Sequence, residues 1–101
     1  MAVLLQIDFP FDGPFGKEMH QAMEPLAQSI SEEPGFFWKI WTENEATHEA
    51  GGIYLFENQE IAEKYLEKHS KRLTEAGIKN IRARFFLINQ PLSAITRADW
   101  L

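Results

Sequence analysis

The segment from Phe36 to Phe56, FFWKIWTENEATHEAGGIYLF, decides the fold because it holds two aromatic-rich strand candidates joined by a short polar loop. Successive side chains of a strand point to opposite faces of a sheet. With that period, Phe36 and Trp38 lie on one face, and Phe37 and Trp41 lie on the other. Both faces therefore carry large apolar groups, although the helices of one small chain cover only one face.

The remaining elements follow from periodicity and from residues that end helices and strands. Asn58 is suited to the N-cap of a helix, and Gly77 is suited to the position just after its last turn. Apolar residues at helical spacing predict a helix between them and an earlier helix from 16 to about 31, which contains Pro25. Alternating apolar residues predict strands at 3–9, 36–43, 51–57 and about 81–88, with a loop at 44–50.

This order, β-α-β-β-α-β, predicts one α+β domain over residues 1–101, with the ferredoxin-like fold and a four-stranded antiparallel sheet. Four strands spaced about 4.8 Å apart make a sheet roughly 19 Å wide. Two helices of about 10 Å diameter cover one face of such a sheet and leave the other face free. We therefore expect a homodimer in which two sheets stack face to face.

Grouping the strand residues by composition, with assumed strand registers, gives one clean apolar face that we expect beneath the helices. Its expected members are Val3, Leu5, Ile7, Phe9, Phe36, Trp38, Ile40, Ile53, Leu55, Ala83, Phe85 and Leu87. The other face mixes aromatic groups with both signs of charge, as expected at a dimer interface. Its expected members are Leu4, Gln6, Asp8, Phe37, Lys39, Trp41, Glu43, Tyr54, Phe56, Arg82, Arg84 and Phe86.

The C-terminal tail is too apolar for a free end, since Leu92, Ile95, Trp100 and Leu101 lie within it. Full burial of each such side chain is worth about 1.5–3 kcal/mol. We expect the tail to pack against a partner subunit or a sheet edge.

Composition limits the classes of function. The 10 Lys and Arg residues against 15 Asp and Glu give a net charge of −5, and no basic stripe is present, so nucleic acid is not an expected partner. The absence of cysteine excludes disulfides, thiolate catalysis and cysteine-based metal sites. The longest apolar run, Ala50–Phe56, is far shorter than the roughly 20 residues that cross a bilayer. We expect a soluble, cytoplasmic protein with no membrane partner.

Four stretches of the chain resemble the YdhR family of putative mono-oxygenases. They are LLQIDFPFDGPFG, EEPGFFWKIWTENEATHEAGGIYLF, YLEKHSKRL and NQPLS, and together they span nearly the whole chain. The resemblance implies a dimeric α+β barrel, in which two ferredoxin-like subunits stack sheet to sheet, and it implies monooxygenase activity. It transfers no established catalytic residue to a matching motif.

The sequence favours an oxygenase without a tightly bound cofactor. It has no GxGxxG after a strand, no HExxH and no clear two-His-one-carboxylate set, although a missing motif does not exclude flavin. A deprotonated phenol, quinol or anthrone-like compound can itself pass an electron to O₂. The protein then supplies an aromatic pocket, a base and donors that stabilise the anion.

We expect this pocket between the clean sheet face and the first helix, near the loop at 44–50. His48 is the candidate base because its ordinary pKa is near neutrality, and Tyr54 and Trp38 are candidate donors. The candidate substrate-binding residues are Phe9, Met23, Phe36, Trp41 and Arg84. His20 and His69 are interpreted as ordinary helix residues, and no metal site is expected.

Two alternatives remain open at the level of sequence. The same barrel could bind a small molecule without turnover, or it could be a non-oxidative isomerase or lyase. A titratable group inside the cavity distinguishes catalysis from binding alone, so the placement of His48 and Tyr54 is the deciding observation.

Overall fold

The computed structural model describes residues 1–100, and its elements occur in the predicted order β-α-β-β-α-β, followed by a short third helix. The strands are β1 (Val3–Pro10), β2 (Phe36–Asn44), β3 (Glu49–Phe56) and β4 (Arg82–Leu87). The helices are α1 (Gly16–Ser31), α2 (Gln59–Glu75) and α3 (Gln90–Ile95). The sequence prediction started β3 two residues late, because Glu49 and Ala50 already pair with β1 and β2.

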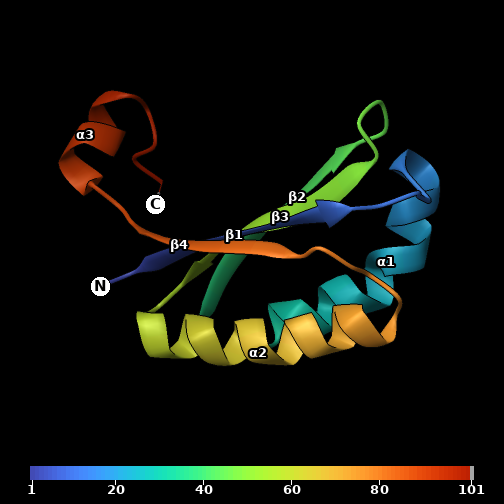
Figure 1. The fold of residues 1–101 in the computed structure, drawn as a ribbon. Coiled ribbons are helices and arrows are strands. Elements are labelled where there is room, and N and C mark those ends of the chain that lie inside the picture. The colour runs from blue at the N-terminus through green and yellow to red at the C-terminus, as the bar shows by residue number, and fades with distance from the viewer. Residues whose placement is uncertain (101) are drawn as a thin grey trace.

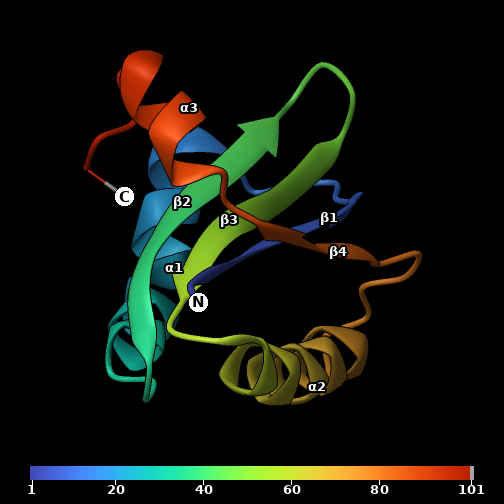
Figure 2. The ribbon, with the colours of Figure 1, turned by 90° about the vertical axis from the view of Figure 1, so that its left-hand side faces the viewer.

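The sheet is antiparallel with the strand order β2-β3-β1-β4, which confirms the ferredoxin-like fold. Helices α1 and α2 cover one face of this sheet, and α3 lies beyond the opposite face (Figure 1). We call the first the helix face and the second the open face. Figure 2 shows β2 and β3 as a long curved hairpin, with β4 at the other edge of the sheet.

The core forms where the central strand β1 meets the two helices. Val3, Leu5 and Ile7 alternate along β1 and are each at most 1% exposed. Tyr65 and His69 of α2 are buried against this face. Asn58 accepts a hydrogen bond from the backbone N–H of Ile61 at 2.9 Å, which confirms the predicted N-cap of α2.

The predicted face of β3 was wrong. Phe56 pairs with Val3 and Tyr54 pairs with Leu5, so both aromatic rings lie on the helix face. Ile53 and Leu55 lie on the open face instead. A strand alternates its side chains strictly, so an assumed register that is one residue out inverts every assignment.

The predicted face of most of β2 was wrong for the same reason. An irregularity between Phe36 and Trp38 shifts the register, so Phe36 packs against the core while Trp38 and Ile40 lie on the open face. Lys39, Trp41 and Glu43 consequently lie on the helix face, since they pair with Tyr54, Gly52 and Ala50. The assignments for β1 and β4 hold, because both strands are regular and pair in register.

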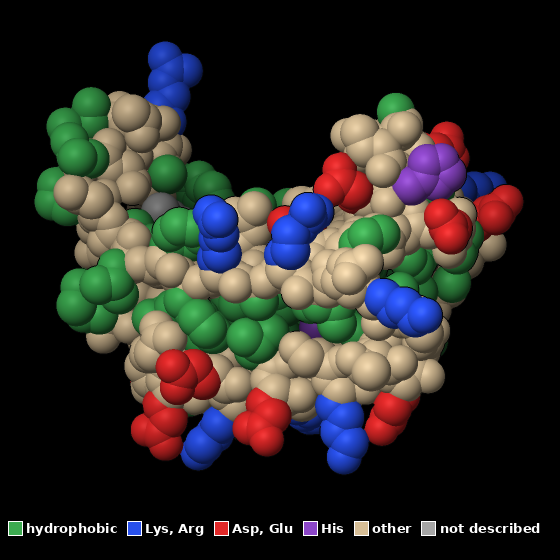
Figure 3. Space-filling model, viewed as in Figure 1, with side chains coloured by type: hydrophobic (Ala, Val, Ile, Leu, Met, Phe, Trp, Pro, Cys, Tyr) green, Lys and Arg blue, Asp and Glu red, His purple; other side chains and the backbone are tan. Residues whose placement is uncertain are grey.

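The open face is partly apolar and hollowed. Ile40 and Phe86 are 46% and 44% exposed there. Figure 3 shows the hollow between α3 and the tip of the β2–β3 hairpin. Its volume is about 430 Å³, and its lining includes Asp8, Arg82 and Arg84. Arg82 forms ion pairs with Asp8 and Glu49 across this surface.

Only part of the C-terminal tail packs against the sheet within one chain. Trp100 packs on Trp38 with ring centroids 5.3 Å apart, but Leu92 and Ile95 are 61% and 77% exposed. The predicted docking of Leu101 lies outside the described residues. No helix within residues 1–100 has the length and apolarity needed to cross a membrane.

Gly51 provides a test of how closely β1 and β3 approach. A Cβ atom at this position would collide with the carbonyl oxygen of Ile7 and lie 2.8 Å from Cα of Asp8, so the backbone would have to move. We expect Gly51→Ala to lower the free energy of unfolding by about 3 kcal/mol, measured by urea denaturation. Gly52→Ala is the matched control, because its Cβ would approach the flexible end of Lys39 most closely, at 2.5 Å from Cε, and the nearest backbone atom, the carbonyl oxygen of Ile40, would lie 3.3 Å away. Equal losses in the two variants would contradict this account.

Candidate functional site

A cavity of about 330 Å³ lies between the helix face of the sheet and helices α1 and α2. Polar groups reach it from three elements: Lys39 from β2, Tyr54 from β3, and His69 and Arg72 from α2. The rest of its wall is largely apolar and includes Phe9, Phe11, Met19, Met23, Leu26, Trp41, Leu73 and Ile78. A mainly apolar cavity with a few converging polar groups is the usual form of a small-molecule site.

The amine of Lys39 is held among aromatic rings rather than in water. Its Nζ lies 3.4 Å from the centroid of the Trp41 ring and 4.6 Å from the centroid of the Tyr54 ring. Burial, and to a smaller extent the nearby charge of Arg72, lowers the pKa of Lys39 from 10.5 to about 7. Lys39 is therefore able to exchange a proton near neutral pH.

Gly52 makes room for this lysine. It lies on the helix face opposite Trp41, and a Cβ atom there would lie 2.5 Å from Cε of Lys39 and 3.2 Å from Cε1 of Tyr54. The side chain of Lys39 therefore crosses the space that a larger residue would fill.

Tyr54 and Tyr65 form a buried aromatic pair beside the cavity. Their hydroxyl oxygens are 3.4 Å apart, and their ring centroids are 5.1 Å apart. Burial raises the pKa of Tyr54, and it raises the pKa of Tyr65 to about 12. Both side chains are therefore neutral phenols at physiological pH, and Tyr54 can donate a hydrogen bond to a ligand.

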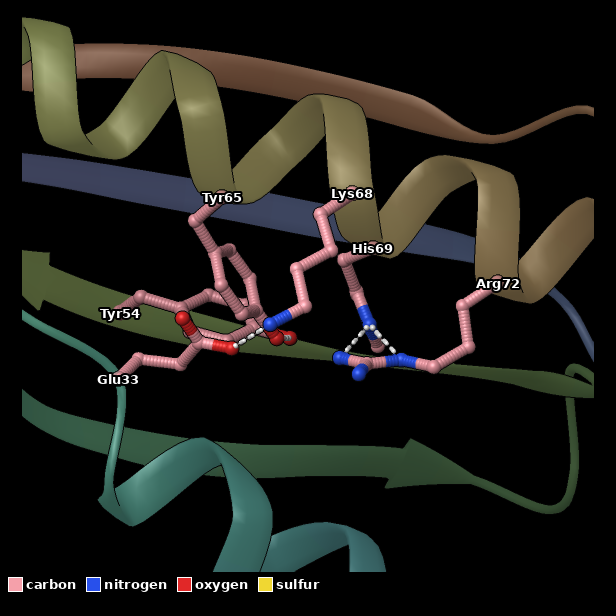
Figure 4. Close-up of polar contacts among 6 residues, drawn as sticks. All are labelled: Glu33, Tyr54, Tyr65, Lys68, His69 and Arg72. Atoms are coloured by element: carbon pink, nitrogen blue, oxygen red, sulfur yellow. Dashed lines mark hydrogen bonds and ion pairs between the residues drawn. The ribbon is translucent and has the colours of Figure 1, made fainter.

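His69 and Arg72 are joined across one turn of α2 (Figure 4). Nε and Nη2 of Arg72 donate to Nδ1 of His69, at 3.3 and 2.8 Å. A guanidinium has no acceptor, so Nδ1 must accept, and the ring proton lies on Nε2. Burial, together with the charges of Lys39 and Arg72, lowers the pKa of His69 to about 3. His69 is thus a neutral imidazole with a defined tautomer.

The structure brings together some of the residues that the sequence analysis proposed for the site. Phe9, Met23, Trp41 and Tyr54 all line the cavity. Phe36 instead packs in the core against Phe56, with ring centroids 5.9 Å apart.

Trp38 and Arg84 lie elsewhere, because both belong to the open face. Trp38 lies under Trp100, and its Nε1 is buried without a hydrogen-bond partner among residues 1–100. Arg84 pairs with Gln6 in the register of β1 with β4 and lines the hollow of the open face. The expectation that Trp38 reaches the helix-side cavity was therefore wrong.

His48 lies at the end of the β2–β3 hairpin and does not line the cavity. Its side chain is 64% exposed, and its Nδ1 lies 3.5 Å from a carboxylate oxygen of Asp12. The expectation that the loop brings His48 into the cavity was wrong, because its ring instead lies edge-on to Phe15, the N-cap residue of α1, with ring centroids 6.4 Å apart.

Lys39, His69 and Arg72 were not predicted as members of the site. His69 was interpreted as an ordinary helix residue, although it is buried on α2 and a polar imidazole in a core needs a partner. Arg72 follows three residues later, within reach of His69 on the same helix face. Lys39 gave no such signal, since its face depends on the irregularity in β2. Within residues 1–100 no group of three His, Cys, Asp or Glu side chains could hold a metal.

The sequence matches, over residues 4–99, the protein family described as "Putative mono-oxygenase ydhR". The chain belongs to this family. No curated protein sequence gave a significant match.

Solved structures of the same fold include several oxygenases. A variant of SnoaB, described as a cofactor-independent oxygenase from Streptomyces nogalater, has a TM-score of 0.62 and 16% identity, and the match covers 88% of this chain and 94% of SnoaB. ActVA-Orf6, a monooxygenase of Streptomyces coelicolor in complex with nanaomycin D, has a TM-score of 0.60 and 20% identity, with 87% and 88% of the two chains covered. At such identities the similarity establishes that this ydhR-family chain shares their fold.

The buried imidazole predicts a specific acid sensitivity. The ordinary pKa of 6.5 applies to His69 in the unfolded chain, and the folded value is about 3. The unfolded chain therefore binds more protons in this window, and the free energy of unfolding should fall as the pH falls from 6.5 toward 3. We expect His69→Gln to lose this part of the pH dependence when urea denaturation is compared at about pH 7 and about pH 4.5.

His20→Gln is the control for this experiment, because the side chain of His20 is 75% exposed. It should retain the wild-type pH dependence. A wild-type slope in His69→Gln would show that the imidazole is not held neutral by the fold.

Proposed function

We propose that this ydhR-family protein is a monooxygenase that acts on small phenol, quinol or anthrone-like compounds without a tightly bound cofactor. The observation that carries the proposal is the amine of Lys39, whose pKa is about 7, inside a largely apolar cavity. General bases work best when their pKa is close to the working pH. Roughly half of such amines are neutral at pH 7 and can accept a proton.

The first step is removal of an acidic proton from the bound aromatic compound. The neutral amine of Lys39 takes this proton and becomes an ammonium beside the anion that it has formed. Arg72 adds a permanent positive charge at the same cavity, and Tyr54 is a neutral donor. Positive charge and donors in an apolar cavity stabilise the developing anion far more than water would.

The substrate itself supplies the electrons for the second step. The carbanion or phenolate passes one electron to O₂, and the resulting radical and superoxide combine into a peroxide at carbon. Lys39 returns its proton to the peroxide. At a CH₂ carbon, loss of the second hydrogen and cleavage of the O–O bond give a carbonyl and one water molecule, so no external reductant is consumed.

Two of the structural neighbours support this choice of chemistry. SnoaB is described as cofactor-independent, and ActVA-Orf6 was crystallised with nanaomycin D. Both share the fold of this chain. The aromatic wall formed by Phe9, Phe11 and Trp41 suits a flat substrate.

Substitution of Lys39 tests the proposal. Oxygen uptake by purified, metal-free protein is first screened over phenols, quinols and anthrones. With a substrate so identified, Lys39→Met should lower kcat by roughly 10²–10⁴, because it removes the base and keeps the length of the side chain. In the wild type, kcat/KM should rise with pH through about 7, as the amine loses its proton.

His48→Ala is the matched control, since the sequence analysis assigned the base to His48 and the side chain is outside the cavity. We expect it to retain the wild-type rate. Full activity of Lys39→Met, or loss of activity in His48→Ala, would contradict the assignment of Lys39 as base.

The exposed position of His48 favours the second candidate function, a barrel that binds a small aromatic compound without turnover. Binding without oxygen uptake for every compound in the screen would support that candidate. Proton exchange at a substrate carbon without oxygen uptake would support an isomerase or lyase, because such an enzyme uses the same base.

We also propose that two copies of the chain pair through their open faces, as a cytoplasmic homodimer. The apolar side chains Ile40, Ile53 and Phe86, together with the ion-paired Arg82, form a mixed surface on that face. Apolar patches with polar surroundings are typical of interfaces between subunits.

Light scattering tests the dimer. The wild type should have twice the 11.7 kDa mass of one chain at micromolar concentration. Ile40→Asp places a charge on the open face and should shift the mass to that of a monomer. Gln21→Asp, on the exposed side of α1, should leave the dimer intact. A wild-type monomer would refute the pairing.

A further inference from the structure

The cavity holds positive charge that the protein itself does not balance. Arg72 donates to His69, and neither Arg72 nor Lys39 forms an ion pair with a carboxylate within residues 1–100. Three other cations do have such partners: Lys64 pairs with Glu60, Lys68 lies 2.6 Å from Glu33, and Arg82 pairs with two carboxylates. Arg72 instead uses two of its donors on a neutral ring inside the cavity.

No carboxylate compensates these charges from the wall of the cavity. Its lining residues within 1–100 include no Asp or Glu. Glu43 is on the same sheet face as Lys39, but its carboxylate accepts a hydrogen bond from the backbone N–H of Gly16 at 2.8 Å. A half-buried charge without a counter-charge is costly, and a ligand that supplies the counter-charge recovers that cost.

We propose that the substrate of this cavity is an aromatic carboxylic acid, whose carboxylate pairs with the guanidinium of Arg72 while its rings lie against the aromatic wall. The inference rests on the proposed function, because it names the substrate class for the same cavity. Nε and one N–H of Nη2 are used on His69, which leaves Nη1 and the second N–H of Nη2 as parallel donors for a carboxylate, and the guanidinium stays charged at every physiological pH. The carboxylate is distinct from the group that Lys39 deprotonates.

Binding of the carboxylate should change the protonation of Lys39. The titratable or charged groups that line the cavity with Lys39 are Tyr54 from β3 and His69 and Arg72 from α2, while α1 contributes the apolar Met19 and Met23. The charge of Arg72 contributes to the low pKa of Lys39. When a carboxylate neutralises Arg72, the pKa of Lys39 should rise, so the complex takes up protons near pH 8 and binding weakens as the pH rises above about 7.

The test compares 2-naphthoate with 2-naphthamide, which has the same shape but no charge. Titration calorimetry with the full-length wild type near pH 8 should show at least about tenfold tighter binding of the naphthoate. Repeating the titration in phosphate and in Tris, which differ in ionisation enthalpy, should reveal proton uptake with naphthoate and none with naphthamide.

Substitutions on α2 locate the charge that is responsible. Arg72→Gln should bind the two probes equally, whereas Arg72→Lys should retain part of the preference because it keeps the positive charge. Lys68→Met removes a cation of the same helix that pairs with Glu33 outside the cavity, and it should keep the wild-type preference. Thermal melts of each variant check that it is folded. If Arg72→Gln does not fold, the two probes on the wild type and on Arg72→Lys still decide the question.

The inference is overturned if the wild type binds the two probes equally or binds neither, if Arg72→Gln keeps the preference, or if naphthoate binds without proton uptake. The experiment measures binding and needs no turnover. A preference for naphthoate without oxygen uptake by any hydroxylated aromatic acid would sustain this inference and remove the oxygenase proposal. Oxygen uptake with neutral anthrones but with no aromatic acid would sustain the oxygenase proposal and remove this inference.

Discussion

The pairing of β1 with β3 is the constraint on which the rest of this structure depends. It sets Leu5 opposite Tyr54 and Ile7 opposite Gly52. One face of the central strands therefore carries aliphatic core residues next to the Tyr54 hydroxyl group and next to a glycine without a side chain. Through β3 the same register places Lys39 of β2 on that face. A shift of one residue would move the amine to the open face and leave the cavity without a base. The backbone pairing of β1 with β3 therefore determines on which face Lys39 of β2 lies.

The order of elements was predictable from the sequence because periodicity and helix caps are local signals. The N-cap of α2 at Asn58 and both long helices follow from such signals, and the apolar alternation of β1 identifies the core face without reference to other strands. The faces of β2 and β3 were not predictable in this way. β2 carries aromatic residues on both faces, and β3 carries aromatic residues on one face and aliphatic residues on the other, so composition does not reveal which face of either strand is buried. The irregularity at the start of β2 then shifts its side chains to the opposite faces.

The site was harder to predict than the fold for a related reason. Histidine in a polar loop is a common guess for a base because its ordinary pKa is near neutrality, yet His48 packs against Phe15 at the start of α1, outside the cavity, with 64% of its side chain exposed. The group that titrates near neutrality is instead a lysine, whose pKa is lowered by burial and by a neighbouring guanidinium. That shift arises only when residues from β2, β3 and α2 meet, so no single segment of the sequence contains it.

The space left by Gly52 has a consequence for how such proteins diverge. The amine occupies a site that a single methyl group would close, since the hypothetical Cβ lies 2.5 Å from its ε-carbon. Glycine and alanine codons differ by one base, and the closest atom that the added methyl group meets is the end of a flexible side chain, while the nearest backbone atom, the carbonyl oxygen of Ile40, lies 3.3 Å away. One base change therefore separates a cavity that holds a reactive amine from an aromatic cavity that does not, within the same fold.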